Sequence, residues 1–453
     1  MQGIWQPLLA AARARGDLSP ELDERFAWEI FMGKDRSVNA FALPGGYFGL
    51  HMGLVSIVTS RDELASVLGH ELSHVTQRHI SRIISKQSAQ APWVIGAMIL
   101  GALAASKNPE AANALIVGGQ AVAAQNQLNF SRDMEREADR VGFGVMTQAG
   151  FEPAAFVSMF EKLQQASRLN DNGAFPYLRS HPLTTERVAD MQARVPAGVP
   201  GRSGASAALP AGNRPELRQT PGHAMVAARA TVLSNPGVDA LRAWGPLAAS
   251  AGFANLDVAR QSAALYGAAL AAMRLRDLTG AAALYGRLVV VTRSDPAAAR
   301  LARLLAMELA LAGDDARQAA ALLDAPSGGA LSGTEARPEL ILASQALVRS
   351  GHASQAAQQL QTWVASRPRD AQAWQLLSSA YAAQGQSLRA IRADAEARFA
   401  QLDYAAALDR FKAAQELARD LSRKGAADHI EASIIDTRAR QTALLLREQS
   451  VER

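Results

Sequence analysis

Two histidines one helical turn apart, with a glutamate between them, are the residues of this chain with the clearest chemistry. Residues 70–74 read His-Glu-Leu-Ser-His. Because four residues make about one turn of an α-helix, His70 and His74 project from the same face and can bind one metal ion. Glu71 lies beside them, where it can take a proton from a water molecule that the ion activates. This spacing predicts a zinc-dependent endopeptidase, and the alternative is a pair of unrelated surface histidines.

A second acidic segment offers the third ligand that a catalytic zinc site needs. Residues 131–139 read Ser-Arg-Asp-Met-Glu-Arg-Glu-Ala-Asp, which places Glu135 and Asp139 one helical turn apart. We expect Glu135 to bind the metal. We expect Asp139 to accept a hydrogen bond from a ligand imidazole, which fixes the tautomer of that ring. Glu137 is interpreted as a solvent-exposed charge that the helix dipole favours.

Capping and alternation patterns predict the elements that position these residues. Ser60-Arg-Asp-Glu63 is a capping box, so a helix is expected to begin at Arg61. Pro44-Gly45-Gly46 lies between two strand-like segments and predicts a tight turn within a small antiparallel sheet. Helices are expected at residues 5–15, 61–85 and 131–150, and strands at residues 26–32, 37–43 and 47–55.

The composition is typical of a globular protein with two or three domains. Of the 453 residues, 49% are hydrophobic and 20% are charged, and there is no cysteine. The lack of cysteine excludes disulfides, thiolate zinc sites and cysteine nucleophiles. The net charge of +5 is not concentrated in any Lys/Arg run, so nucleic acid is not an expected partner.

The longest apolar stretches are too short to cross a bilayer. No run reaches the roughly 20 residues that a transmembrane helix needs, so no span is expected. Residues 92–124 contain two shorter apolar segments, Trp93–Ala105 and Ala111–Ala124, around an Asn-Pro turn. This pattern predicts a helical hairpin. The hairpin is either buried, or it forms a mobile cover or membrane-surface element beside the active site.

A composition shift divides the chain into two parts. Residues 196–221 are rich in Gly, Pro, Ala and Ser and have no apolar period, which indicates a linker. The linker separates a predicted metallopeptidase domain, residues 1–195, from a predicted helical domain, residues 222–453. In the helical domain Gly351 recurs as Gly385 and Ala356 as Ala390. This spacing of about 34 residues predicts an all-α array of tetratricopeptide-like repeats.

Four segments together resemble the zinc metallopeptidases grouped with the CAAX prenyl protease and the heat-shock protease HtpX. These segments are His70-Glu-Leu-Ser-His74, Glu135-Arg-Glu-Ala-Asp139, Asn39-Ala-Phe-Ala-Leu-Pro-Gly-Gly46, and Ser180-His-Pro182 with Arg187. The layout, a peptidase domain followed by tetratricopeptide-like repeats, is most similar to that of periplasmic members of this family. The fold class expected is therefore mainly α, with a zincin-like α+β metallopeptidase domain that contains a small antiparallel sheet.

The resemblance also implies one Zn²⁺ per chain and a role for each residue of the site. The implied residues are His70, His74 and Glu135 as ligands, Glu71 as general base, Asp139 behind a ligand, and His181 and Arg187 close to the metal. His181 could fill the fourth coordination position and keep the enzyme latent. It could instead donate to the developing oxyanion, as could Arg187. A loop histidine that only makes local hydrogen bonds is the alternative.

The substrate is expected to lie extended across the metal and to pair with the edge of the sheet by strand addition. The residues expected to form this edge are Asn39, Ala40, Phe41, Ala42 and Leu43. A purely structural strand is the alternative. Recognition through the backbone is weakly selective for sequence, which suits a protease that removes misfolded chains.

The remaining histidines are expected to have no part in the chemistry. His51 is interpreted as a packing residue of a strand, and His79 as lying off the ligand face of the helix. No chemistry is assigned to His223, His352 or His429.

Two functions of different classes fit these features. The first is a periplasmic zinc endopeptidase for unfolded or misassembled outer-membrane proteins, with repeats that recruit partners such as the outer-membrane protein assembly machinery. The second is a chaperone or assembly adaptor whose protease is normally latent. The intact metal motif and Glu135 favour the first, because an adaptor needs no water-activating glutamate. A CAAX-type membrane protease fits less well, because no spanning helix is expected.

The periplasmic location follows from the resemblance alone. The first residues, Met-Gln-Gly-Ile-Trp, do not form a signal peptide. We therefore expect the N-terminus to be truncated or misassigned.

Overall fold

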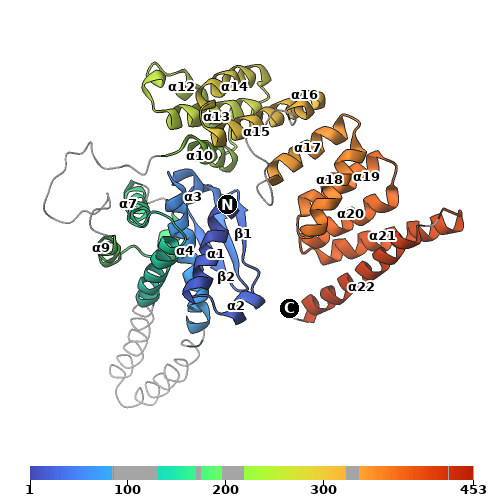
Figure 1. Ribbon diagram of the computed structural model, residues 1–453, viewed down its shortest axis with the longest axis horizontal. Helices are drawn as coiled ribbons and strands as arrows, with labels where there is room; N and C mark the ends of the chain where they lie inside the picture. The colour runs from blue at the N-terminus through green and yellow to red at the C-terminus, as the bar shows by residue number, and fades with distance from the viewer. Residues whose placement is uncertain are drawn as a thin grey trace, which may run out of the picture. The chain divides into compact units, whose positions relative to one another are not determined.

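The structure of the chain, a computed structural model, describes residues 1–83, 85, 131–169, 175–195, 219–322, 336–426 and 428–451 (Figure 1). The chain divides into two compact units, Met1–Ala271 and Ala272–Arg453. The apolar segments of residues 92–124 lie outside the described residues, as does most of the predicted linker. Among the described helices, none is both long and apolar enough to cross a bilayer.

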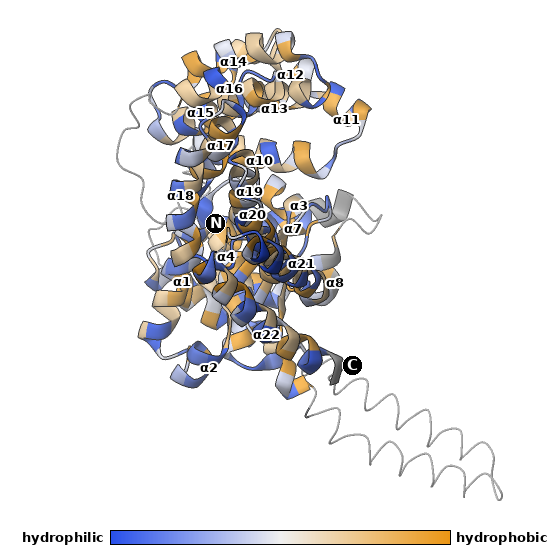
Figure 2. Cartoon of the chain, turned by 90° about the vertical axis from the view of Figure 1, so that its right-hand side faces the viewer, coloured by the Kyte–Doolittle hydropathy of each residue, from blue (hydrophilic) through white to orange (hydrophobic). Residues whose placement is uncertain are grey.

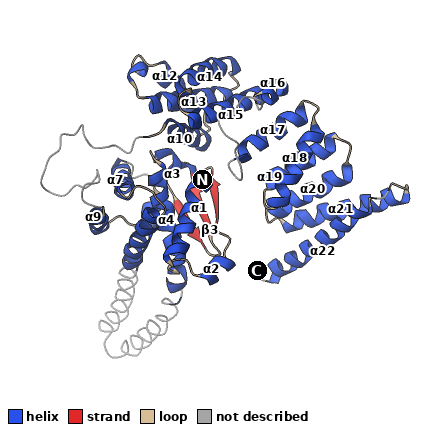
Figure 3. Cartoon of the chain, viewed as in Figure 1, coloured by secondary structure: helices blue, strands red, loops and turns tan. Residues whose placement is uncertain are grey.

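The first unit combines helices with one small sheet (Figure 3). Its elements are α1 (Gln2–Arg15), α2 (Pro20–Arg25), β1 (Glu29–Gly33), β2 (Ala40–Leu43), β3 (Tyr47–His51), α3 (Met52–Ile57), α4 (Arg61–Thr76), helix 131–148, α7 (Ala154–Leu169), α8 (Pro176–Ser180), α9 (Thr185–Arg194), α10 (Pro221–Ser234), α11 (Val238–Arg242), α12 (Trp244–Ala249), η1 (Phe253–Asn255) and α13 (Val258–Arg274).

The sheet is mixed, so the prediction of an antiparallel sheet was wrong in part. The strand order is β1-β3-β2, with β2 antiparallel to β3 and β1 parallel to it. The turn at Pro44–Gly46 produces the predicted hairpin. β1 lies on the other side of β3, where Ala27 N donates to Gly45 O and Glu29 N donates to Gly46 O. These bonds fix the start of β1 beside the start of β3, so the two strands run in the same direction.

The predicted third strand, residues 47–55, was too long. β3 ends at His51 and the chain turns at once into α3. Gly53 permits this turn, because any side chain there would overlap the carbonyl groups of Arg36 and Ser37. The Gly53 amide donates to Asp35 O. Close backbone contact therefore replaces strand pairing at this point.

Helix α4, which carries the metal-binding motif, begins where its capping box predicted. Ser60 Oγ accepts a hydrogen bond from Glu63 N at 3.1 Å. The predicted helix of residues 61–85 is interrupted after Thr76, because Arg78 adopts a left-handed conformation with φ 54°. Residues 79–83 and 85 are again helical. Almost the whole length of α4 is buried, and it packs on α1, α7 and β2. It is thus the central element of the core, in which Trp5, Phe48, Leu72 and Phe156 are also buried.

Helix α10 belongs to the first compact unit, although the sequence assigned it to the helical domain. It packs against α3 (Figure 1). Ala230 joins the core of this unit, and His223 Nε2 lies 3.0 Å from Val58 O. These contacts place the division between the compact units after Ala271 rather than within residues 196–221. Packing against α3 cannot be foreseen from the composition of the linker.

The described residues of the second unit form helices and no strands (Figure 3). After the end of α13 these helices are α14 (Leu278–Thr292), α15 (Pro296–Ala312), α16 (Ala316–Ala321), α17 (Arg337–Arg349), α18 (Ala353–Ser366), α19 (Ala371–Ala383), α20 (Ser387–Ala400), α21 (Tyr404–Arg423) and α22 (His429–Val451). Aspartates such as Asp295, Asp370 and Asp403 cap helix N-termini through their side chains.

Successive helices of the second unit pack on one another, from α17 to α22. Figure 2 shows both hydrophilic and hydrophobic residues along α21 and α22, as helices with one buried face require. Trp374, Leu377 and Tyr381 on α19 are buried in the cluster between neighbouring helices. Gly351 and Gly385, which defined the sequence period, each come just after a helix and adopt a positive φ. The identity of these helices as tetratricopeptide repeats stays a prediction.

Candidate metal centre

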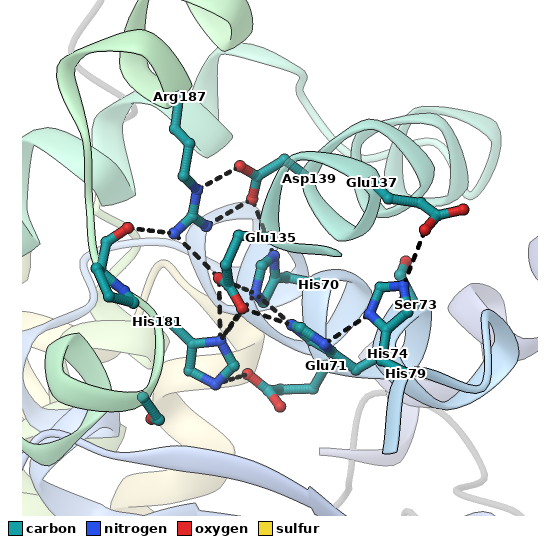
Figure 4. Close-up of polar contacts among 12 residues, drawn as sticks. His70, Glu71, Ser73, His74, His79, Glu135, Glu137, Asp139, His181 and Arg187 are labelled. Atoms are coloured by element: carbon teal, nitrogen blue, oxygen red, sulfur yellow. Dashed lines mark hydrogen bonds and ion pairs between the residues drawn. The ribbon is translucent and has the colours of Figure 1, made fainter. Parts of the chain in front are cut away.

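Three segments far apart in the sequence meet at one point in the first unit. His70 and His74 come from α4, Glu135 from helix 131–148, and His181 from the residue that ends α8. One nitrogen or oxygen from each of these four residues lies within 4.8 Å of the others. Figure 4 shows the four side chains pointing toward one another. The structure therefore brings together all the metal ligands that the sequence analysis named.

A close approach of two helix backbones makes this meeting possible. Gly69 on α4 faces Gly142 on helix 131–148, and a side chain at Gly142 would lie 2.9 Å from the Gly69 carbonyl carbon and the His70 nitrogen. Small residues at both positions let the helices touch. Glu135 can then reach the histidines of α4.

The distances between the donor atoms fit a tetrahedral metal ion. His70 Nε2 lies 3.0 Å from His74 Nε2 and 3.4 Å from Glu135 Oε2, and His74 Nε2 lies 3.4 Å from Glu135 Oε1. Zinc bonds of about 2.05 Å in tetrahedral geometry separate neighbouring ligand atoms by about 3.3 Å. Two imidazoles and a carboxylate are also ligands that zinc prefers. The arrangement of these residues therefore suits this ion.

His181 supplies a fourth donor at similar distances. Its Nδ1 lies 3.3 Å from His70 Nε2 and 3.1 Å from each carboxylate oxygen of Glu135. Its Nε2 lies 3.5 Å from Glu71 Oε1. Four donors around one point make a closed set, whereas a catalytic zinc keeps one position open.

Glu71 faces the same point. Its side chain is almost fully buried, and Oε1 forms no hydrogen bond within the described part of the chain, where His181 Nε2 lies 3.5 Å from it. A buried carboxylate oxygen that makes only such a long contact is costly unless a ligand or water also uses it. The position of this oxygen is one that a general base needs.

Asp139 and Arg187 support His70 from behind (Figure 4). His70 Nδ1 lies 2.9 Å from Asp139 Oδ1, and Arg187 binds the Asp139 carboxylate through Nε at 2.6 Å and a terminal nitrogen at 2.8 Å. Arg187 also contacts Glu135 Oε2 at 3.0 Å and donates to Pro182 O. The guanidinium thus links the candidate metal ligands to the loop that carries His181.

The charges of this cluster act on each other across a dry interior. Burial alone would lower the pKa of His70, but its contacts with Asp139 and Glu135 raise that pKa to about 10. Burial opposes ionisation of Asp139, yet Arg187 and His70 hold the pKa of this carboxyl below its usual value. Glu135 behaves in the same way, because His181 and His70 outweigh its burial and lower its pKa. Both carboxylates are therefore ionised in the folded protein.

His74 has a separate set of supporting residues, which the sequence analysis missed. Its Nδ1 lies 2.9 Å from His79 Nδ1, and His79 Nε2 lies 3.2 Å from Glu137 Oε2. Glu137 is also bound by Arg82 at 2.6 Å. Interpreting Glu137 as a purely solvent-exposed charge was therefore wrong. Arg78, which adopts a left-handed conformation, turns the chain so that His79 faces back toward His74. No pattern in the sequence predicted this turn.

The predicted substrate strand lies at an edge of the sheet, next to α4, the helix that carries His70 and His74. β2 covers Ala40–Leu43 and packs on α4, and among the described residues it pairs with β3 on one side only. Asn39 precedes the strand, and its carbonyl accepts from His51 N. His51 contacts Ser37 Oγ through Nδ1 at 2.9 Å. It lies outside the group of four donor residues.

A pocket opens between the end of β2 and helix α4. Its volume is about 240 Å³. Its lining includes the apolar residues Leu22, Phe26, Leu43, Val75 and Ile80, together with His74. Glu21 at its rim pairs with both Arg25 and Arg78. An apolar pocket that reaches a candidate metal ligand is a suitable place for a substrate side chain.

Comparison with known proteins identifies the family of this region. Residues 11–195 match the family described as Peptidase family M48. The chain is 34% identical over 268 residues to the putative beta-barrel assembly-enhancing protease of Vibrio cholerae, which covers 59% of this chain and 51% of that protein. It is 36% identical over 171 residues to the beta-barrel assembly-enhancing protease of Escherichia coli K12, which covers 37% and 34% of the two chains.

A more distant relative is the mitochondrial metalloendopeptidase OMA1 of Saccharomyces cerevisiae, 27% identical over 201 residues, 43% of this chain and 55% of that protein. The matches thus span about half of the Vibrio cholerae relative and about a third of the Escherichia coli one. The family match, residues 11–195, contains the four donor residues. From the family match and the geometry of the site together, residues 11–195 of this chain are a peptidase family M48 domain.

Proposed function

We propose that the chain is a zinc-dependent metalloendopeptidase of the bacterial periplasm that cleaves misfolded or stalled outer-membrane proteins. The observation that carries the proposal is the donor geometry. His70 Nε2, His74 Nε2 and the Glu135 carboxylate lie 3.0–3.4 Å apart. The Glu71 carboxylate, whose Oε1 forms no hydrogen bond in the described part of the chain, faces them. The names of the bacterial relatives support the substrate class, since they describe proteases that enhance beta-barrel assembly.

In this proposal His70, His74 and Glu135 hold one zinc ion. When bound, zinc supplies a Lewis acid that lowers the pKa of water to about 7 and polarises the peptide carbonyl. Glu71 accepts the proton of the attacking water and returns it to the leaving amine.

Arg187 is proposed as a positioning residue rather than an oxyanion donor. Its guanidinium is almost fully buried and is already bound to Asp139, Glu135 and Pro182 O. Moving it to a substrate would leave two carboxylates without their cation, which is costly in a buried site. We therefore assign it to holding Glu135 and Asp139 in place.

His181 is proposed as the latch of a latent enzyme. Its Nδ1 stands among the other donors at 3.1–3.3 Å, so it competes with water for the fourth metal position. We expect His181→Ala to increase basal casein cleavage. A loss of cleavage would support the oxyanion role instead, and no change in cleavage or zinc affinity would remove both roles. The latch also leaves room for the alternative function, an assembly adaptor whose protease is normally silent.

The substrate is proposed to lie along β2 as an added strand. The free edge of β2, beside α4, supports this placement. The neighbouring apolar pocket, which includes Leu43 and His74, would accept an apolar side chain. Unfolded outer-membrane proteins offer such extended segments, with alternating apolar residues.

The helices of the second unit are proposed as tetratricopeptide-like repeats that recruit substrates or the outer-membrane protein assembly machinery. The support is the recurrence of Gly351 as Gly385 and the packing of successive helices from α17 to α22. Stacked helix pairs form extended surfaces for protein partners. A pull-down from envelope extracts with the full chain and with variants of this surface tests the assignment.

The catalytic proposal is tested by two variants measured side by side. Glu71→Gln should keep zinc and fold but lose casein cleavage by several orders of magnitude, because the base is removed while the ligands remain. Glu135→Ala should instead lose zinc affinity. Glu161→Gln, an exposed glutamate of α7, is the matched control and should change neither property. Cleavage by Glu71→Gln at nearly the wild-type rate would contradict the assigned mechanism.

A further inference from the structure

We propose that His79 is a positioning residue for the metal centre, which accepts the Nδ1 proton of His74 and so directs the unprotonated Nε2 of His74 toward the metal. The inference rests on the proposed function only in taking His74 as a metal ligand. It assigns a role to a histidine outside the metal-binding motif. It also explains why Glu137 and Arg82 lie behind the site.

The contact between the two imidazoles is short and buried. His74 Nδ1 and His79 Nδ1 lie 2.9 Å apart, and the ring planes are inclined by 80° (Figure 4). The exposed fraction of His79 is only 1%. Two buried nitrogens at this distance share one proton, so one of them donates and the other accepts.

The partner of the second His79 nitrogen decides which ring donates. His79 Nε2 lies 3.2 Å from Glu137 Oε2, and an ionised carboxylate can only accept. His79 Nε2 therefore carries a proton. In a neutral imidazole the other nitrogen is then an acceptor, so the shared proton belongs to His74 Nδ1.

The role of His74 as a ligand leads to the same assignment. An imidazole that binds a metal through Nε2 carries its proton on Nδ1, and His79 Nδ1 is 2.9 Å from that nitrogen, within reach of the proton. With its proton on Nδ1, neutral His74 has a lone pair on Nε2, the nitrogen that lies 3.0 Å from His70 Nε2. Neutral imidazole with a free nitrogen is the form that binds a metal.

The two ligand histidines thus have parallel but unequal supports. His70 meets the carboxylate of Asp139 directly, at 2.9 Å, and Arg187 binds that carboxylate. His74 reaches its carboxylate, Glu137, only through His79, and Arg82 binds that carboxylate at 2.6 Å. Each of these two series of hydrogen-bonded side chains ends on an arginine, which keeps its carboxylate ionised. The inserted imidazole is what lets Glu137, on the outer side of helix 131–148, act on His74.

Three substitutions at position 79 separate this role from packing. His79→Phe keeps the ring volume but removes the acceptor. His79→Asn restores an acceptor oxygen near the place of Nδ1, and His79→Gln places its amide near Nε2, where it can bind Glu137 only. We measure zinc affinity of the full chain by chelator competition, and the tautomer of His74 in the zinc-loaded protein by ¹⁵N NMR.

We expect His79→Phe and His79→Gln to weaken zinc binding by about 10–100-fold, the effect typical of removing the partner of a metal-bound histidine. His79→Asn should recover most of this loss. The Nδ1–H signal of His74, bonded to an acceptor in wild type and in the Asn variant, should shift or exchange rapidly in the other two.

His223→Gln is the matched control, because His223 is another partly buried histidine of this unit and its Nε2 lies 3.0 Å from Val58 O, outside the group of four donor residues. It should not change zinc affinity. Equal zinc affinity in wild type and His79→Phe would overturn the inference, as would equal losses in the Asn and Gln variants. If His79→Phe does not fold, the Asn and Gln pair still decides. Retention of zinc by Glu135→Ala would instead contradict the proposed function.

Discussion

The two compact units arrange their charged residues in opposite ways. In the first unit, charges from distant segments are buried around one point. His70 and His181, 111 positions apart in sequence, lie 3.3 Å from each other, and Arg187 binds Asp139 with both side chains almost fully buried. Each of these groups has more than one partner, so the removal of one changes the surroundings of several others.

In the second unit, charges join neighbouring parts of the chain in separate pairs. Four examples are Arg300–Glu339, Arg337–Asp370, Arg392–Glu431 and Arg438–Glu396, with sequence separations of 39, 33, 39 and 42. Several of these side chains are partly exposed, such as Arg337 at 40%. A pair of this kind contributes locally and can be lost without disturbing the others.

This difference indicates that one unit is interdependent and the other modular. A buried network couples the free-energy effects of its members, whereas separated pairs give nearly additive effects. The first arrangement suits a metal site, which requires several groups held in one geometry. The second suits a stack of helices, in which each helix contacts the one or two helices before and after it.

The largest expected difference between the two units is in the loss of stability when one arginine of each unit is replaced by alanine. Arg187→Ala leaves Asp139 and Glu135 buried without their cation, and should lower the free energy of unfolding by about 3–5 kcal/mol. Arg337→Ala should cost about 1 kcal/mol or less, because Asp370 keeps its hydrogen bonds from Trp363 Nε1 and Ala373 N. Urea unfolding of the full chain measures both. Similar losses in the two variants would contradict the comparison.

The next largest difference is expected when one glycine of each unit is replaced by alanine, in both stability and zinc binding. Gly142→Ala forces a methyl group against the backbone of Gly69 and His70, and should cost about 2–3 kcal/mol by overpacking and also weaken zinc binding. Gly351→Ala meets no atom within 4 Å but keeps a positive φ of 87°. It should cost about 1 kcal/mol and leave zinc binding unchanged. Unaltered zinc affinity in Gly142→Ala would show that the helix contact does not hold the site.

The stability of the first unit should also depend on pH through Glu63. This buried carboxylate is bound by Lys162 Nζ at 2.6 Å and by Ser158 and Thr59. Burial opposes its ionisation, but these partners outweigh burial and lower its pKa. A carboxylate whose pKa is lower in the folded than in the unfolded state, about 4.3, stabilises fully above that value. The stabilisation is lost as the pH falls through the folded pKa.

Glu63→Gln removes this titration. The variant should be less stable than wild type by about 1–2 kcal/mol at pH 7, and the difference should shrink as the pH falls below about 4.3. Urea unfolding of the two proteins between pH 7 and pH 3 measures it. A difference that stays constant over this range would assign the effect to packing rather than to charge.

The smallest expected difference between the units is in how the free-energy effects of two substitutions add. In the second unit, Arg300→Ala and Arg392→Ala break pairs that share no partner, so their effects should add within about 0.5 kcal/mol. In the first unit, Asp139→Asn and Arg187→Gln break the same contact. Their double mutant should depart from additivity by about 0.5–3 kcal/mol. Equal coupling in both units would mean that the second unit is not modular.

Local patterns predicted the parts of the site that lie within one helix. The spacing of His70 and His74 placed both imidazoles on one face of α4, and the capping box at Ser60 placed the start of that helix, which the structure confirms. The period that joins Glu135 and Asp139 placed both carboxylates on one side of helix 131–148. Such predictions succeed because helical geometry repeats over a few residues, whatever the rest of the fold does.

Other features depended on contacts between distant parts of the chain. The parallel pairing of β1 with β3, the packing of α10 on α3, and the meeting of His79 with His74 were decided by tertiary structure. The first rests on the close approach of Gly46, which has a positive φ, to the residues before β1, and the last follows the left-handed conformation of Arg78. Residue types and spacing by themselves determined which groups could bind a metal. Only the folded chain decided which histidine supports which ligand, because that depends on the paths of several segments at once.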